Sequence, residues 1–354
     1  MNIAIVGCGA QAKQHVRVLK AMNAFNLVAL CDVDKRALAI ASDEWNLPHT
    51  YTNFDEMLER EKLDLISILT PPQTHVQLAI GAVDRGISLL VEKPLTLLAS
   101  EAELILKHLE NSSAKLTVNY NGLFSKTMLK ALSLVRSGGI GDVLGMRVEF
   151  LNPKDDPMTS DRNHWCHKNF GGRFGEMLAH PVYLLQSILG NNLTVANVIA
   201  EKRGSYDWMA HDELHVTLRG EAGPGEIYAS FNSPRPAYLV DIFGTERILK
   251  IDLTNQTLIA LGQRTLKKTD AAFDCLHVSR ELFLYTIRNS LEYVLLGRGD
   301  GSLQEAYSSL VHSVGTGDPP LVTPNMAYHT VKTVEEICKQ IDPAGMIHWR
   351  RTPS

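Results

Sequence analysis

The sequence predicts two domains: an α/β domain with a parallel sheet, followed by an α+β domain built on a large, mostly antiparallel open sheet. The 354 residues are enough for two domains of ordinary size. The first 120 residues alternate short apolar runs with helix-length amphipathic stretches, which is typical of βαβ units. Beyond residue 120, strand-like segments follow one another across short turns, which favours antiparallel pairing.

Five short apolar runs are the expected strands of the first domain, because buried parallel strands are apolar on both faces. They cover residues 3–6, 27–31, 65–69, 87–91 and 116–118. Amphipathic patterns between them predict helices, among them residues 11–22, 35–45 and 101–109. We therefore expect the first domain to span residues 1–120.

The second domain is expected over residues 121–354. A helix over residues 125–135 ends at Ser137-Gly138-Gly139. The expected strands then cover residues 143–151, 213–218, 226–231, 238–243, 247–253 and 257–261. We expect helices on one face of their sheet. The last helix begins after Thr323-Pro324 and runs to about residue 340, and it is able to pack back on the first domain.

Composition excludes several classes of partner. Lys and Arg number 35 against 39 Asp and Glu, so the net charge is −4 with neutral His, without the basic field that nucleic acid requires. No apolar run approaches the roughly 18 residues of a membrane span, and the N-terminus lacks a basic secretory region. Five cysteines show no CxxC spacing. We expect a cytoplasmic protein that acts on a small molecule and binds neither nucleic acid nor membrane.

A glycine pattern follows the first expected strand. It reads Gly7-Cys8-Gly9-Ala10-Gln11-Ala12 and leads directly into a helix-like stretch. This is the dinucleotide-binding fingerprint with alanine in the third place. Gly7 permits a tight turn, Gly9 lets backbone amides approach a pyrophosphate, and Ala12 is small enough for close helix-to-strand packing. An α/β domain that merely turns on glycine is the alternative.

Asp32 ends the second expected strand, about twenty residues after the glycine pattern, where an acid can bind ribose hydroxyls. A carboxylate about 4 Å from a 2′-phosphate would be repelled by around 4 kcal/mol at a moderate effective dielectric. Asp32 therefore favours NAD over NADP. Lys35 and Arg36 leave NADP open, because they are either phosphate partners or solvated residues of a first helical turn.

Two more motifs follow later strands. Thr70-Pro71-Pro72 with His75 comes after the third run, and Glu92-Lys93-Pro94 comes after the fourth. Together with the glycine pattern, these motifs resemble the GFO/IDH/MocA family of NAD(P)-dependent oxidoreductases, which includes glucose-fructose oxidoreductase and inositol 2-dehydrogenase. The resemblance covers essentially the whole chain and implies a Rossmann domain that binds NAD, with NADP as the alternative. The expected cofactor contacts are Gly7, Gly9, Ala10, Gln11, Ala12, Asp32, Lys35, Arg36, Thr70, Pro71, His75, Glu92 and Lys93.

The resemblance implies that Lys93 lies beside the nicotinamide and the reacting carbon. This agrees with the rule that the carboxyl ends of parallel strands line the ligand crevice. Pro94 disfavours helical backbone at Lys93. Strand alternation is expected to send Glu92 and Lys93 to opposite sides, so that the acid need not neutralise the amine. A solvent-exposed lysine before a turn is the alternative.

In the second domain, the family carries an Asp and, four residues later, a His on a helix that faces the nicotinamide. Glu176 and His180 occupy the matching positions, and the spacing puts both on one helix face. Glu in place of Asp moves the carboxylate out by one methylene. Pro181 predicts that the helix starts late or kinks. A structural role for His180 and a helix-start role for Glu176 are the alternatives.

Dehydrogenation of a secondary alcohol needs a base within reach of the hydroxyl proton. A histidine, with an ordinary pKa of about 6.5, needs less tuning than a lysine at about 10.4. We therefore expect His180 to accept the proton and Lys93 to polarise the carbonyl, while Glu176 orients His180 or binds a substrate hydroxyl. Further substrate contacts are expected at Asn119, Tyr120, His164, Trp165, Arg173 and Tyr183.

The segment around His164 has two readings. No second ligand group accompanies His164-Trp165-Cys166-His167, so we expect no metal site. Basic side chains outnumber acidic ones by one over residues 154–173. This excess favours an anionic substrate, such as a sugar acid or nucleotide sugar, with a solvated loop of mixed charge as the alternative.

The expected function is hydride transfer between a nicotinamide cofactor and a secondary hydroxyl or keto group of a sugar, polyol, sugar acid or nucleotide sugar. An NAD-dependent glycosidase that oxidises its substrate transiently and a noncatalytic dinucleotide-binding regulator are the alternatives. The joint presence of Lys93 and His180 argues against the regulator. Family members pair through the open sheet face, which an exposed apolar surface would favour, so we expect a homodimer or homotetramer.

Overall fold

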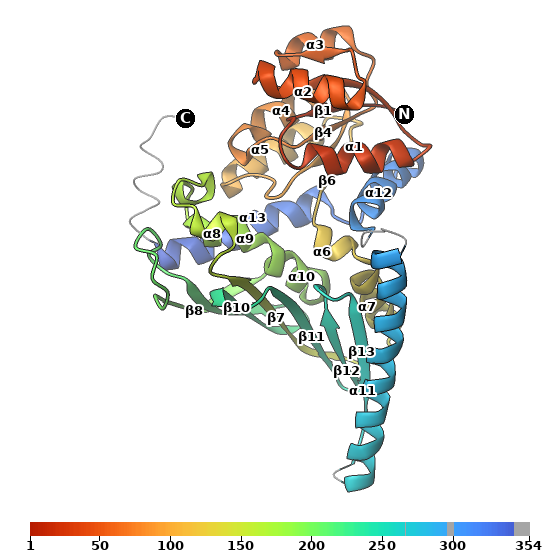
Figure 1. Cartoon of the computed structure of the whole chain (residues 1–354), viewed down its shortest axis with the longest axis vertical. Coiled ribbons are helices and arrows are strands. Elements are labelled where there is room, and N and C mark those ends of the chain that lie inside the picture. The colour runs from red at the N-terminus through yellow and green to blue at the C-terminus, as the bar shows by residue number, and fades with distance from the viewer. Residues whose placement is uncertain (266, 296–300, 343–354) are drawn as a thin grey trace. The chain divides into compact units, whose positions relative to one another are not determined.

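The computed structural model describes residues 1–265, 267–295 and 301–342, which form two compact units (Figure 1). Unit 1 comprises Met1–Asn121 together with Leu303–Lys332. Unit 2 comprises Gly122–Ser302 and the described residues that follow Lys332.

Unit 1 contains a six-stranded parallel sheet in the order β3-β2-β1-β4-β5-β6. The strands are β1 (Asn2–Val6), β2 (Asn26–Cys31), β3 (Thr50–Tyr51), β4 (Leu65–Ile68), β5 (Ser88–Val91) and β6 (Leu116–Val118). All five predicted strands are confirmed. The sequence missed β3, because a strand of two half-buried residues leaves no apolar run to detect.

Helices pack along this sheet and join its strands. They are α1 (Ala12–Ala21), α2 (Lys35–Trp45), α3 (Phe54–Arg60), the 3₁₀ turn η1 (Pro72–Thr74), α4 (His75–Val83) and α5 (Ala99–Leu109). Asp34 caps α2, because its carboxylate accepts from the backbone amides of Arg36 and Ala37. The core consists of the strands and the inward helix faces, and Ile3, Ile5 and Leu65 have no exposed surface.

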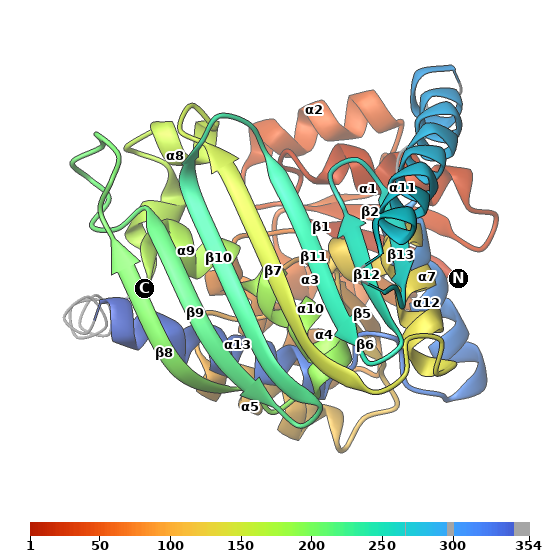
Figure 2. The same ribbon diagram turned by 90° about the horizontal axis from the view of Figure 1, so that it is seen from below.

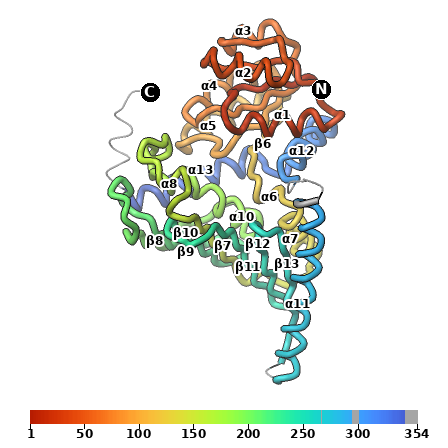
Figure 3. The backbone as a smooth tube through the Cα atoms, viewed as in Figure 1, coloured from red at the N-terminus to blue at the C-terminus, as the bar shows by residue number. Residues whose placement is uncertain are grey.

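Late chain segments complete unit 1. Most of α12 (Ser302–Thr316) and the first half of α13 (Pro324–Ile341) belong to it. Figure 3 traces both helices in blue. The Thr117 hydroxyl on β6 donates to the Val322 carbonyl at 3.0 Å, and the Tyr307 hydroxyl lies 2.7 Å from Ser67 on β4. These two buried hydrogen bonds therefore join residues more than 200 positions apart in the sequence.

Unit 2 contains a seven-stranded sheet in the order β13-β12-β11-β7-β10-β9-β8. The strands are β7 (Val143–Pro153), β8 (Thr194–Glu201), β9 (Glu213–Gly220), β10 (Gly223–Ser233), β11 (Ala237–Gly244), β12 (Arg247–Asp252) and β13 (Thr257–Gly262). Among the described strands of this sheet, only β7 and β10 pair in parallel, so the predicted mostly antiparallel sheet is confirmed. The sequence missed β8, an edge strand whose residues are all exposed or half-exposed.

One face of this sheet carries α10, which packs against β7, β9 and β10. The helices of unit 2 are α6 (Asn121–Phe124), α7 (Lys126–Arg136), α8 (Pro157–Ser160), η2 (Trp165–Lys168), α9 (Gly172–Met177), α10 (Ala179–Leu189), α11 (Lys268–Asn289) and a π-helical turn (Ser290–Leu295). The other face is in the foreground of Figure 2. Among the described helices, none combines the length and the apolar character needed to cross a bilayer.

The foreground sheet face carries polar and charged side chains on β7, β9 and β10, together with the exposed Ile199 on the edge strand β8. Arg147 pairs with Glu149 at 2.8 Å, and the His215 ring stacks on Tyr228 with centroids 4.4 Å apart. Alternation along β7, β9 and β10 sends the apolar side chains to the α10 side instead. Exposed apolar side chains gather on α11, which lies beside β13 in Figures 1 and 2.

Candidate active site

The glycine loop of unit 1 has the tight turn predicted from the sequence. Gly7 has a φ of +100°, and a Cβ built on it would lie 2.8 Å from the backbone carbon of Leu69, so only glycine fits. A Cβ on Gly9 would meet nothing within 4 Å. Among the described residues, α1 starts with neither a side-chain cap from Gln11 nor an acid in its first turn. The loop therefore leaves room for an anion at a helix N-terminus.

Asp32 is held against this loop. One carboxylate oxygen accepts from the Cys8 amide at 2.6 Å, and the other accepts from the Asp34 amide at 2.8 Å. The next side chain, Val33, is 88% exposed although it is apolar. Lys35 and Arg36 are exposed at the start of α2. The carboxylate and an apolar side chain thus lie together beside the glycine loop.

Two thiols at these strand ends are unreactive. Burial, reinforced by the nearby Asp32 charge, raises the pKa of Cys8 and of Cys31 to about 12. Both therefore stay protonated at neutral pH and serve as small packing groups.

Glu92, at the carboxyl end of β5, is the centre of a buried network. One of its oxygens accepts from the Asn119 amide at 2.7 Å and lies 3.0 Å from His15 Nε2. Burial alone would raise the pKa of Glu92, but His15, Asn119 and the Lys93 charge outweigh it, and the pKa lies below its ordinary value. Glu92 is therefore an ionised anchor for the loop that carries Lys93.

The network continues from Glu92 into the interior of unit 1. His15, on the helix that follows the glycine loop, is 1% exposed, and its Nδ1 lies 2.7 Å from the Tyr307 hydroxyl. That hydroxyl in turn lies 2.7 Å from Ser67. The chain of contacts links the glycine-loop helix α1, the Lys93 loop, β4 and α12.

Asn119 also carries an orphaned acceptor. Its Oδ1 is buried and has no hydrogen-bond partner within the part of the chain that the structure describes. An unpaired buried acceptor of this kind is costly unless a ligand or water supplies a donor. Its amide group is already fixed by Glu92, so Oδ1 has a set direction.

His75 has a different role from the predicted cofactor contact. Its ring has no exposed surface. Nε2 lies 2.8 Å from the Thr70 carbonyl, and Nδ1 lies 3.1 Å from the carbonyls of Pro94 and Leu95. Burial lowers the pKa of His75 despite these carbonyls. The buried ring therefore lies between the Thr70-Pro71 loop and the loop after Lys93, and as a neutral imidazole it donates to only one of them.

In unit 2, the helix predicted to carry both Glu176 and His180 is two helices. Glu176 lies on α9 and His180 on α10, with Leu178 between them. Pro181 is the third residue of α10, where the missing amide would have no intrahelical partner. The late start that Pro181 predicted is thus present.

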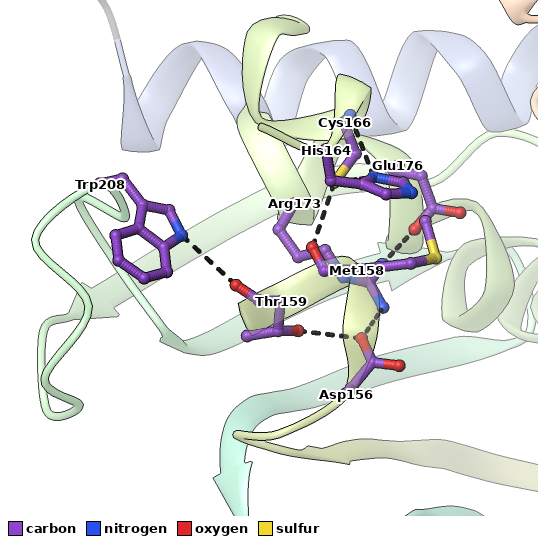
Figure 4. A network of polar contacts seen from close by, with 8 residues as sticks. All are labelled: Asp156, Met158, Thr159, His164, Cys166, Arg173, Glu176 and Trp208. Carbon is purple, nitrogen blue, oxygen red and sulfur yellow. Dashed lines mark hydrogen bonds and ion pairs between the residues drawn. The ribbon is translucent and has the colours of Figure 1, made fainter. Parts of the chain in front are cut away.

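Glu176 and Arg173 form a buried ion pair (Figure 4). The Arg173 guanidinium also lies 3.4 Å from Asp156, so two carboxylates surround one cation. Arg173 was predicted to contact substrate, but its side chain is only 6% exposed and is committed to these acids. A buried guanidinium paired in this way offers no net positive charge to an anion.

His164 and Cys166 belong to the same neighbourhood (Figure 4). His164 caps η2 by accepting from the Cys166 amide, and its ring lies 3.1 Å from the Cys166 sulfur. Burial raises the pKa of Cys166 to about 11. The Trp165 side chain is 39% exposed. Nearby, the Trp208 indole donates to the Thr159 carbonyl at 3.3 Å. Within the described residues, no group of three potential ligands is arranged for a metal ion.

His180 sits in an aromatic cage. The Phe150 ring stacks on it with centroids 5.3 Å apart, and the Tyr183 hydroxyl lies 3.1 Å from Nδ1. Tyr238 packs edge-on against the imidazole and donates to the His180 carbonyl at 2.8 Å. Tyr183 was predicted to contact substrate, but it is fully buried and contacts His180 instead.

Comparison with protein families decides the affiliation of this fold. A model of the oxidoreductase family's NAD-binding Rossmann fold matches residues 1–120, and a model of the GFO/IDH/MocA C-terminal domain matches residues 128–250. The chain belongs to the GFO/IDH/MocA oxidoreductase family. The predicted resemblance, the redox class and the NAD cofactor are therefore confirmed.

Individual GFO/IDH/MocA relatives are distant. D-apiose dehydrogenase of Paraburkholderia graminis is 27% identical over 70% of this chain and 66% of its own, just under two thirds of that protein. Myo-inositol 2-dehydrogenase of Thermotoga maritima is 23% identical over 95% of this chain and 97% of its own. A crystal structure of an oxidoreductase from Agrobacterium radiobacter in complex with NAD+, L-tartaric acid and magnesium has a TM-score of 0.75 at 18% identity, over 96% of each chain. This last likeness concerns the fold.

The residues of unit 1 fit the cofactor of the GFO/IDH/MocA family. The open space at Gly9 and the uncapped start of α1 suit a pyrophosphate. Asp32 suits ribose hydroxyls, and its charge opposes a 2′-phosphate.

Sequence reasoning missed several residues that shape the site. His15 and Tyr307 were overlooked because their partners lie 77 and 240 or more positions away in the sequence. Phe150 and Tyr238 fall inside predicted strands, where an aromatic residue signals only a sheet. Val33 could have been found from the sequence, because it directly follows the acid at the end of a strand, where side chains are exposed.

Proposed function

We propose that the protein transfers a hydride between NAD and a secondary hydroxyl or keto group of a neutral sugar or polyol. The observation that carries the proposal is the position of Lys93 in unit 1. Lys93 follows β5 on the sheet edge that also carries the glycine loop, and Glu92 anchors its loop. In an open parallel sheet, this edge is where ligands bind.

Unit 1 supplies the cofactor contacts. Backbone amides near Gly9 bind the pyrophosphate, Asp32 accepts from the ribose hydroxyls, and the exposed Val33 packs against the adenine ring. The Asp32 charge makes NAD the preferred dinucleotide. When bound, NAD supplies the nicotinamide that accepts or donates the hydride.

The proton is handled by protein side chains. In the oxidative direction, His180 accepts the hydroxyl proton while the substrate C–H bond breaks with its electron pair. Lys93 donates a hydrogen bond to the same oxygen and stabilises the developing carbonyl. In the reductive direction, His180 returns the proton. The buried Asn119 Oδ1 accepts from a ligand amide or hydroxyl, which satisfies its missing partner.

A neutral substrate fits the charges of unit 2 better than an anionic one. Arg173, which shortly precedes His180 in the sequence, is a buried cation. It is shared between Glu176 and Asp156 and adds no net positive charge. The curated relatives named above act on apiose and myo-inositol, which are neutral polyhydroxy compounds. His164 and Trp165 contact the substrate, whereas Tyr120, which was also predicted to do so, is fully buried like Tyr183.

The test is a spectrophotometric screen for reduced nicotinamide over neutral sugars, polyols, sugar acids and nucleotide sugars. His180→Gln and Lys93→Met each lower kcat by roughly 10²- to 10⁴-fold on the best substrate, the usual contribution of general acid–base catalysis. Matched controls are His108→Gln and Lys107→Met, which change exposed residues of α5 and leave kcat unchanged. Full activity in the His180 or Lys93 variant, or free sugar released without net NADH, would refute the proposal.

We also propose that the chain forms a homodimer or homotetramer. Phe273, Leu276, Phe283 and Ile287 are exposed on α11, and Phe273 is 71% exposed. Successive members are three, seven and four residues apart, which places them on one helix face as in helix-to-helix seams. A second copy of the chain is the occupant that supplies an identical apolar face.

A further inference from the structure

Two tyrosines and one backbone amide surround the inner side of the His180 ring. Tyr183 is buried and Tyr238 half-buried against it, and the Gly122 amide contacts the Tyr183 hydroxyl. A Cβ on Gly122 would lie 2.7 Å from the Tyr183 hydroxyl oxygen, so only glycine lets this amide approach the tyrosine. Phe150 fixes the plane of the imidazole by stacking at 16°.

The protons in this cluster can be assigned one by one. Tyr238 donates its only proton to the His180 carbonyl at 2.8 Å. The hydroxyl oxygens of Tyr183 and Tyr238 both approach the Cβ position of Gly122, at 2.7 and 3.2 Å, and share a hydrogen bond whose proton must come from Tyr183. Burial, reinforced by Tyr183, holds the pKa of Tyr238 well above its ordinary value, so Tyr238 keeps its proton.

With its proton directed to Tyr238, the Tyr183 oxygen has two lone pairs to offer. Gly122 N–H donates to one of them at 2.9 Å. The other faces His180 Nδ1 at 3.1 Å, which makes Tyr183 an acceptor for that nitrogen. A neutral imidazole carries one proton, so a proton on Nδ1 leaves the lone pair on Nε2.

We propose that Tyr183 and Tyr238 hold His180 as the Nδ1–H tautomer, which makes Nε2 the atom that accepts the substrate proton. Tyr183 is thus a positioning residue that acts through His180. The catalytic consequence rests on the proposed function, whereas the tautomer is a property of unit 2 alone.

Nitrogen-15 NMR of imidazole-labelled protein tests the tautomer directly. The chain has 13 histidines, and the His180 signals are identified by their loss in His180→Gln. We expect Nδ1 protonated and Nε2 unprotonated in the neutral ring. A neutral His180 protonated on Nε2 would overturn the proposal, whatever the enzyme's activity. The NMR result also stands if His180→Gln proves to be active, because the measurement reports the tautomer and not catalysis.

Two variants test the assignment of each proton. Tyr183→Phe removes the acceptor at Nδ1 and shifts the tautomer toward Nε2–H. Tyr238→Phe leaves Tyr183 in contact with His180 but frees the Tyr183 proton to bond Nδ1, so it also shifts the tautomer toward Nε2–H. A purely structural role for Tyr183 predicts an unchanged tautomer in Tyr238→Phe. That result contradicts the proposal even if Tyr183→Phe does not fold.

Kinetics supply the second measurement. Each variant lowers kcat by roughly tenfold to a hundredfold, less than loss of the base itself, and changes the pH profile of kcat/KM. Tyr228→Phe is the matched control, because it removes a tyrosine hydroxyl bonded to Glu213 on the open sheet face of the same unit. Equal losses in Tyr228→Phe and Tyr183→Phe would contradict a specific role for Tyr183.

Discussion

Buried carboxylates show how single residues set the properties of this protein. Asp212, directly before β9, accepts from Lys202 Nζ at 2.6 Å and from the amides of Arg203 and Gly204 at 2.7 and 2.8 Å. Burial alone would raise the pKa of Asp212, but these donors outweigh it and the pKa lies below its ordinary value. Its stabilising effect is therefore present at neutral pH and is lost as the pH falls through the folded-state pKa.

We predict that Asp212→Asn destabilises the protein by about 3 kcal/mol at neutral pH, because it leaves Lys202 and two amides poorly paired. The difference from wild type shrinks below about pH 4, where the wild-type carboxylate of the unfolded and then of the folded chain becomes protonated. Urea unfolding at a series of pH values measures both effects. Asp241→Asn, which removes an ion pair with the half-exposed Lys250, is the control and costs under about 1 kcal/mol. A gap independent of pH would contradict the prediction.

At the scale of elements, local patterns predicted most helices and strands, while contacts between distant elements escaped. The amphipathic pattern predicted a helix over residues 35–45, and α2 has the same bounds. Pro181 signalled a late helix start, and α10 begins two residues before it. The link from Glu92 through His15 to Tyr307 could not be predicted, since it depends on how α1, β5 and α12 pack. Arg173 looked like a substrate cation because its partner Asp156 precedes it by 17 residues.

The α1–β5–α12 link makes a testable prediction. His15→Ala deprives Glu92 and Tyr307 of their shared partner and costs about 2–3 kcal/mol of stability. Because α1 starts at the glycine loop, NAD affinity also falls. Thermal unfolding and calorimetric titration with NAD measure the two effects, and His312→Ala, at an exposed position on α12, is the control. Unchanged NAD affinity in a folded His15→Ala variant would show that the link does not support the loop.

At the scale of the whole molecule, the two sheets could be predicted from the sequence. Helix-length stretches separate the strands of the first sheet, whereas short turns separate most strands of the second. The exposed apolar stripe on α11 did not follow from the sequence. Family resemblance suggested the open sheet face, where polar side chains such as Arg147 and His215 lie, whereas several exposed apolar residues lie on α11. Which side of a strand faces solvent depends on how the strand pairs with its neighbours. Of the α11 residues, only Tyr285 is buried, so the apolar side chains of this helix are left exposed.

We predict that Phe273→Asp combined with Phe283→Asp converts the assembly to a monomer, since two charges on each copy would have to be buried in the seam. Sedimentation equilibrium measures the mass. Leu144→Asp, at a 56% exposed apolar position on β7, serves as the control and leaves the assembly intact. A monomeric wild-type protein, or an unaffected double variant, would contradict this use of α11.

Net hydride transfer from a substrate carbon is the central claim, and isotope transfer tests it most directly. The best neutral sugar or polyol from the screen is deuterated at its carbinol carbons and incubated with the enzyme and NAD. Mass spectrometry is expected to find reduced nicotinamide carrying one deuterium in equal amount to the oxidised product. Unlabelled cofactor, or label that stays in a hydrolysed sugar while no reduced cofactor accumulates, would contradict it.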